Sequence, residues 1–145
     1  MSTVRHLLAK KGNEVWSVGP DTQVDEALGL MASKNVGALL VLDGGDIAGI
    51  FSERDYARKV FLKGKSSKTT PVSEIMTRDV ITIEPDHSIE GCMELMSDNK
   101  IRHLPVVEDG KVAGVISIGD LVNAIITDQK FVIGQLENYI KGTDS

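Results

Sequence analysis

A serine and an aspartate three residues apart occur twice in the chain, each time after a glycine that ends a short apolar run. The first pair is Ser52 and Asp55, and the second is Ser117 and Asp120. If the aspartate opens a helix, its carboxylate and the serine hydroxyl lie beside backbone N–H groups that the helix start leaves unpaired. A carboxylate placed there can accept two hydrogen bonds from the cis-diol of a ribose. For one copy alone, an ordinary helix cap is the simpler interpretation.

The duplication extends far beyond these four residues. A shift of 65 residues aligns residues 18–55 with residues 83–120 without a gap. Identical residues include Pro20, Asp21, Leu30, Met31, Leu39, Gly45, Ala48 and Gly49, which align with Pro85, Asp86, Leu95, Met96, Leu104, Gly110, Ala113 and Gly114. Two copies of so long a unit are unlike a solenoid, so the repeat predicts two related units packed as a pseudo-twofold pair.

Each unit has the pattern of a β-α-β-β-α element, which gives a mixed α/β (α+β) fold. The predicted strands are 15–18, 38–42 and 47–51 in the first unit, and 80–83, 104–107 and 112–117 in the second. Glycine and aspartate between the last two strands of each unit predict a hairpin. Apolar residues at helical spacing predict helices that begin at the N-caps Asp21 and Asp86, and second helices cover 56–62 and 121–126.

These patterns resemble a tandem pair of CBS domains, named after cystathionine β-synthase. Besides the element order and the Ser-x-x-Asp pairs, the resemblance includes Ile-Met-Thr at 75–77 and Arg-His-Leu-Pro-Val at 102–106. The resemblance covers nearly the whole chain. The chain is similar to stand-alone CBS-pair proteins of bacteria and to mitochondrial CBS-pair proteins of plants. We expect unit 1 with its basic loop at 1–68, unit 2 at 69–127, and a helical tail at 128–145, with no catalytic domain.

The resemblance implies one adenine-nucleotide site in the cleft of each unit. Ser52 and Asp55 would hold the ribose in one site, and Ser117 and Asp120 would hold it in the other. Backbone around Val18 and Ile83 would contact the adenine edge, and Ile50 and Val115 would form walls for the base.

The expected phosphate contacts differ between the units. Arg54 aligns with Gly119, while Arg102 and His103 align with Gly37 and Ala38. An arginine suits a phosphate through its bidentate fork, and His103 is either a pH-sensitive donor or a partly buried histidine with a structural role. The basic loop formed by Lys65, Ser66, Ser67 and Lys68 supplies hydroxyl and ammonium donors. We expect AMP in one cleft and NAD(H), ATP or ADP in the other, with Arg54 and this loop holding the additional phosphates.

Charge, apolar runs and cysteine content limit the partners, location and chemistry that we expect. The net charge of −5 disfavours a nucleic-acid partner. No apolar run approaches the ~20 residues needed to cross a membrane, so we expect a cytoplasmic protein without a membrane partner. Cys92 is the single cysteine and aligns with an apolar position, which predicts a buried residue. Neither a metal cluster nor a poised acid–base pair is visible, so we expect no metal, no catalytic cofactor and no enzymatic activity.

The end of the chain predicts one more amphipathic helix at 128–141, capped by Asp128 and stopped by Gly142. Its apolar side contains Val132, Ile133, Leu136, Tyr139 and Ile140. The helix either packs against its own unit or covers the interface of a homodimer, and the resemblance favours the homodimer.

The leading hypothesis is a regulatory module that binds adenine nucleotides and signals energy or redox state to a protein partner. The alternative is an interaction scaffold with vestigial clefts, and an enzyme acting on the nucleotide is the least favoured.

Overall fold

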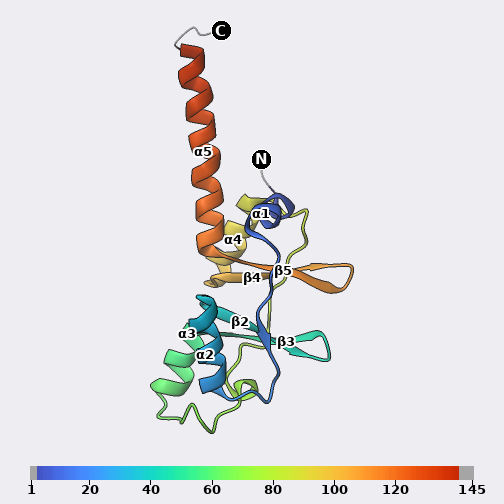
Figure 1. Cartoon of the computed structure of the whole chain (residues 1–145), viewed down its shortest axis with the longest axis vertical. Helices are drawn as coiled ribbons and strands as arrows, with labels where there is room; N and C mark the ends of the chain where they lie inside the picture. Colours follow the sequence, from blue (N-terminus) through green and yellow to red (C-terminus); the bar gives the residue numbers. More distant parts are fainter. Residues whose placement is uncertain (1–2, 141–145) are drawn as a thin grey trace.

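The computed structural model describes residues 3–140 and contains the two predicted units, one above the other in Figure 1. The first unit contains β1 (Ser17–Val18), α2 (Val24–Lys34), β2 (Ala38–Asp43), β3 (Asp46–Ser52), α3 (Glu53–Asp55), the π-helical segment η1 (Tyr56–Phe61) and the 3₁₀ turn η2 (Val72–Glu74). The second contains α4 (Ile89–Asn99), β4 (His103–Glu108), β5 (Lys111–Ser117) and α5 (Ile118–Ile140), and α1 (Val4–Lys11) packs beside it. The strands of both units lie in the middle of the molecule, with α2 and α4 on the outer sides (Figure 1).

The predicted hairpins are confirmed, and they have the same geometry in both units. Each has a two-residue turn with positive φ at both positions, Gly44 and Gly45 in one and Asp109 and Gly110 in the other. Such turns match the twist of antiparallel strands and favour glycine. The register pairs Ala38 with Ser52 and His103 with Ser117, so each serine lies at the open end of its hairpin. The hairpins therefore deliver the two Ser-x-x-Asp segments to equivalent places.

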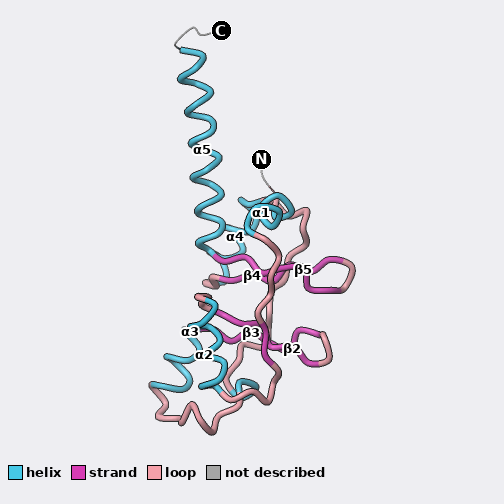
Figure 2. Tube along the Cα trace, viewed as in Figure 1, coloured by secondary structure: helices cyan, strands magenta, loops and turns pink. Residues whose placement is uncertain are grey.

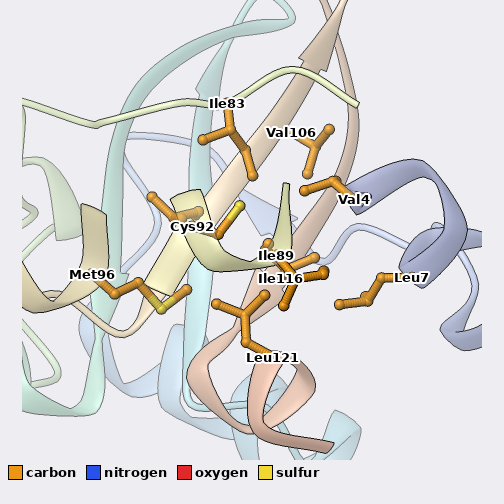
Figure 3. Close-up of a cluster of buried hydrophobic side chains, with 10 residues drawn as sticks. Val4, Leu7, Ile83, Ile89, Cys92, Met96, Val106, Ile116 and Leu121 are labelled. Atoms are coloured by element: carbon orange, nitrogen blue, oxygen red, sulfur yellow. The ribbon is translucent and has the colours of Figure 1, made fainter. Parts of the chain in front are cut away.

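Each unit has its own buried core, but the chain crosses between the cores at two places. Val4 and Leu7 of α1 belong to the second core, where Figure 3 shows Val4 beside Val106 and Leu7 beside Ile116. Conversely, Val72, Ile75 and Met76 belong to the first core. Helix α1 therefore packs in the core of the second unit, and residues 72–76 pack in the core of the first. Both segments thus cross the boundary between the units at 1–68 and 69–127 that the sequence suggests. Cys92 is completely buried in the second core, as expected, and burial raises its pKa to about 11.

Three predictions about local structure were wrong. The strand at 80–83 reduces to a single bridge in which Ile83 pairs with Val106, and Figure 2 shows loop around it. The reason is that only Ile83 reaches the sheet: it donates to Pro105 O and accepts from Val107 N. The first strand is likewise shorter than predicted and covers Ser17–Val18.

The helix caps are the second correction. The caps are Gln23 and Ser88, each two residues after the predicted Asp21 and Asp86. Ser88 is the better cap because its hydroxyl accepts from the backbone N–H of Gly91 over 2.9 Å. The third correction concerns α5, which runs through Asp128 without a break, so Asp128 is not a cap. The predicted stop at Gly142 lies outside the described residues, and α1 was not predicted at all.

Candidate functional site

Two clefts lie between the units. The first cleft, about 430 Å³ in volume, is lined by Ile50, Ser52 and Asp55 from the first unit and by Asp79, Val80, Ile81, Ile101, Arg102 and His103 from the second, among others. The second cleft, about 330 Å³ in volume, is lined by Val115, Ser117 and Asp120, by Lys11, Gly12, Glu14 and Trp16, and by residues 35–38, with His103. Each cleft therefore combines the Ser-x-x-Asp segment of one unit with backbone from the other.

The clefts are repeat-related. The 65-residue shift maps Asp55 onto Asp120 and places Glu14 and Trp16 opposite Asp79 and Ile81. The linker before β1 therefore forms a wall of the second cleft, and the linker before α4 forms the equivalent wall of the first. Gly37, His103 and Ser117 line both clefts, so the two clefts share a wall.

In the first cleft, Asp55 is buried and fully engaged by protein groups. Its Oδ1 accepts from Thr77 Oγ1 over 3.1 Å and from Lys59 Nζ over 2.9 Å. Its Oδ2 accepts from the backbone N–H and the hydroxyl of Ser52, each over 3.0 Å. The residue is 7% exposed and forms a capping box with Ser52. Since a carboxylate offers about four acceptor positions, Asp55 has none left in this conformation.

In the second cleft, Asp120 keeps one oxygen open. Its Oδ2 accepts from Lys11 Nζ and from the backbone N–H of Ser117, both over 2.8 Å. Its Oδ1 has no hydrogen-bond partner within residues 3–140. Partial burial acts to raise the pKa of Asp120, but the hydrogen bonds from Lys11 and Ser117 prevail and hold the pKa below its usual value. The ionised carboxylate is therefore available to a donor from a ligand.

The predicted phosphate-binding side chains are divided between several places. Arg54 and Arg102 both line the first cleft, although Arg54 Nη1 already donates to Lys100 O over 2.8 Å. His103 lies in the shared wall, and no hydrogen bond of its ring is found among the described residues. Burial lowers the pKa of His103, opposed by the negative charge of Asp120 and assisted by the positive charges of Lys11, Arg102 and Arg54. A neutral imidazole is therefore favoured near pH 7.

Other predicted site residues lie away from both clefts. Val18 pairs with Val41 inside the first sheet, and Ile83 is buried in the second core, with both backbone groups bound to β4. The basic loop packs against the start of α2, where Ser67 O accepts from the backbone N–H of Asp25. Figure 1 shows this loop at the outer end of the first unit. The structure therefore does not bring Lys65, Ser66, Ser67 or Lys68 to a cleft.

Sequence reasoning missed the residues that replace them. Asp79, Val80 and Ile81 line the first cleft, and Glu14 and Trp16 line the second, at or just before the start of the expected strands 80–83 and 15–18. Thr77 and Lys11 bind the two aspartates. The repeat held a usable signal, since these linkers align under the same 65-residue shift. The contacts of Lys11 and Thr77 are long-range and had no signal in the local pattern.

Comparison with known proteins agrees with this architecture. The family model described as "CBS domain" matches residues 4–61 and 72–127. The chain belongs to the CBS-domain family. Its relatives include the mitochondrial CBS domain-containing protein CBSX3 of Arabidopsis thaliana, which is 39% identical over 151 residues, covering 97% of this chain and 73% of CBSX3.

Solved structures of CBS-pair proteins have the same fold. A protein with CBS domains from Burkholderia ambifaria MC40-6 superimposes with a TM-score of 0.85 at 51% identity, covering 88% of this chain and 96% of that one. The CBS domain pair of MJ0100, solved with 5′-methylthioadenosine and S-adenosyl-L-methionine, has a TM-score of 0.76 at 25% identity, covering 88% and 98%. CBS pairs are regulatory modules that often bind adenosine-containing ligands, as the MJ0100 pair does.

Two further findings concern the remaining predictions. No group of three or more metal-binding side chains is found within residues 3–140. Over the same residues, no helix has both the length and the apolar character needed to cross a membrane.

Proposed function

We propose that the protein is a regulatory module that binds adenine nucleotides in the clefts between its two CBS units and reports energy or redox state to a protein partner. The observation that carries the proposal is the ionised carboxylate of Asp120, which lines the second cleft with Oδ1 open to a donor. A ribose diol supplies such donors. Trp16, Val36 and Val115 line the same cleft and offer apolar surface to a base.

The clefts differ enough to hold different ligands. Arg54 and Arg102 line the first cleft, which supports binding of a mononucleotide such as AMP there. NAD(H), ATP or ADP then belongs to the second cleft, where Lys11 offers a cation beside Asp120. A regulatory signal also requires that the ligand bind two states of the protein with different affinities.

Calorimetric titration tests this proposal. AMP, ATP, NAD⁺ and NADH are titrated separately into protein shown to be nucleotide-free by its absorbance spectrum. We expect saturable binding of at least one of them, weakened by Asp120→Asn, which keeps the shape of the side chain and removes its charge. Lys111→Met, a change at the exposed first residue of β5, is the matched control. Absence of binding by all four ligands would overturn the proposal.

The alternative function, an interaction scaffold, is favoured by the surface of α5. Six large apolar side chains on this helix are exposed: Val122, Ile126, Val132, Ile133, Leu136 and Ile140. Five of them, with Gln129, follow the 4-3-4-3-4 spacing of a coiled-coil seam at 122, 126, 129, 133, 136 and 140. Figure 1 shows the second half of α5 projecting from the body. Such a seam favours another helix as its partner.

We propose that this partner is α5 of a second copy, which gives a homodimer. Lys130 and Glu137 each follow a seam position by one residue, at 129 and 136. In an antiparallel pair of α5 helices centred near Ile133, Lys130 of one copy therefore faces Glu137 of the other, and the contact occurs twice.

The expected cytoplasmic location stays a prediction, which cell fractionation would test. The expected absence of catalysis and of a catalytic cofactor would be tested by incubation with nucleotides, and the expected absence of nucleic-acid binding by a DNA-binding assay.

A further inference from the structure

A groove between α1 and α5 adjoins the second cleft. It has a volume of about 190 Å³ and is lined by α1 residues 6, 7, 10 and 11 and by α5 residues from Asp120 to Asp128. Lys11 and Asp120 line both the groove and the second cleft, so the two spaces meet at this ion pair. A ligand whose ribose is bound by Asp120 therefore has the groove next to it.

The ammonium of Lys11 has a donor to spare at this junction. It donates to Asp120 Oδ2 and to Val115 O, each over 2.8 Å. A lysine ammonium carries three N–H donors, and these two are the contacts of Lys11 within the described part of the chain. The third donor and the open Oδ1 of Asp120 together offer an anion site beside a diol site.

The groove supplies further groups that suit a phosphate. Lys10 brings a second ammonium, and His6, Asn123 and Thr127 bring polar side chains. Asp120 and Asp128 also line the groove and balance the two lysines, so a phosphate there depends on the N–H donor that Lys11 keeps beyond its ion pair with Asp120. A lysine binds phosphate as a compact point charge, which suits a ligand that exchanges with solvent.

The first cleft has no counterpart of this arrangement. The 65-residue shift places Met76 where the second cleft has Lys11, and Met76 is buried in the first core. Asp55 is instead bound by Lys59 of η1, which directly follows it, and by Thr77. A cation at the junction with α1 is therefore particular to the second cleft.

We propose that the groove between α1 and α5 is a phosphate subsite of the second cleft, in which Lys11, assisted by Lys10, binds the 5′-phosphates of a nucleotide whose ribose is held by Asp120. The second cleft then selects adenosine 5′-phosphates over uncharged adenosine. This inference rests on the proposed function, because it requires that the second cleft bind an adenosine group.

The single tryptophan makes the second cleft observable by itself. Trp16 lines that cleft, and the equivalent position in the first cleft is Ile81. Lys34 Nζ lies 4.4 Å from the centroid of the indole ring, and both residues belong to the first unit. Intrinsic fluorescence during titration with adenosine, AMP and ADP therefore reports binding in the second cleft.

We expect wild-type protein to bind ADP at least about tenfold more tightly than adenosine, the ratio that one charge-assisted hydrogen bond provides. Lys11→Met, which copies the residue of the first unit, should reduce that ratio to about two while adenosine still binds. Lys11→Arg should keep most of the preference, and Lys10→Met should weaken ADP more than AMP. Lys111→Met is the control, and urea unfolding confirms that each variant folds.

The outcomes separate this inference from the proposed function. Absence of both a Trp16 response and a calorimetric signal with adenosine, AMP, ADP, ATP, NAD⁺ and NADH would overturn both. If adenosine and ADP bind the wild type equally, or if Lys11→Met keeps the wild-type ratio, the phosphate subsite is wrong and the adenosine site stands. If salt abolishes the ADP preference in the wild type but Lys11→Met does not change it, the cation is another residue, and the inference also fails.

Discussion

The ammonium of Lys59 lies 2.9 Å from Oδ1 of Asp55, one helical turn away along the chain. With Thr77 and Ser52, it occupies all the acceptor positions of a carboxylate that is 7% exposed. Asp120 holds the same place in the repeat but is bound by a lysine from the other end of the chain and keeps one oxygen open. We therefore expect the two aspartates to divide the tasks that the repeated motif suggests, with Asp55 stabilising the fold and Asp120 available to a ligand.

Substitution of the two aspartates should separate these tasks. Asp55→Ala leaves three hydrogen-bond donors at a buried position without an acceptor and removes the ion pair with the part-exposed Lys59, so the free energy of unfolding should fall by about 2–4 kcal/mol. Asp120→Ala removes a partly buried cap and ion pair, so we expect a loss of about 1 kcal/mol. Urea unfolding followed by circular dichroism measures both. Equal losses for the two variants would contradict this division.

Gly49 and Gly114 are equivalent in the repeat, yet they should tolerate alanine differently. A Cβ on Gly49 would lie 2.8 Å from the backbone oxygen of Thr77 and 2.6 Å from Met76 Sδ. A Cβ on Gly114 would lie 2.8 Å from a methyl group of Leu8, which can rotate away. Overpacking against backbone costs about 1–3 kcal/mol, so Gly49→Ala should lower the unfolding free energy by about 2 kcal/mol more than Gly114→Ala. The urea midpoints of the two variants test this difference.

Stability should fall below neutral pH because of His103. Burial is the main cause that lowers its pKa in the folded state, where it faces Asp120, Lys11, Arg102 and Arg54. The unfolded chain then binds a proton more readily than the folded protein, so stability declines as the pH falls from about 6.5 through the lower pKa of the folded state. His103→Gln should remove this part of the decline between about pH 7 and pH 5. An unchanged slope of unfolding free energy against pH would show that His103 does not titrate as described.

The sequence predicted features that are encoded locally or repeated. Both hairpins and the placement of Ser52 and Ser117 at their ends follow from glycine turns and the 65-residue repeat. Contacts between distant segments could not be predicted in this way. Lys11 meets Asp120 only because Val4 and Leu7 anchor α1 in the second core. The basic loop was predicted to bind phosphate because of its composition. Its backbone is hydrogen-bonded to the start of α2, which keeps the loop away from both clefts.

The length of α5 also escaped prediction, since Asp128 looked like a cap in sequence. The helix passes through this position because its apolar seam keeps the same period on both sides, from Val122 to Ile140. This continuity joins the second unit to the seam proposed for the dimer. A charge in the middle of the seam should therefore disrupt assembly without affecting the clefts.

Ile133→Glu should convert the dimer to a monomer, because it introduces two carboxylates into an apolar contact with no partner. Light scattering coupled to size-exclusion chromatography measures the mass, with Gln135→Glu, exposed and outside the seam, as the control of equal charge. Reversal of one charge, Glu137→Lys, should weaken the dimer by placing it opposite Lys130, and the double change Lys130→Glu with Glu137→Lys should restore it. A wild-type protein that is monomeric at about 100 μM, a concentration at which an interface worth more than about 5.5 kcal/mol would assemble, would refute the α5 dimer, as would full assembly of Ile133→Glu.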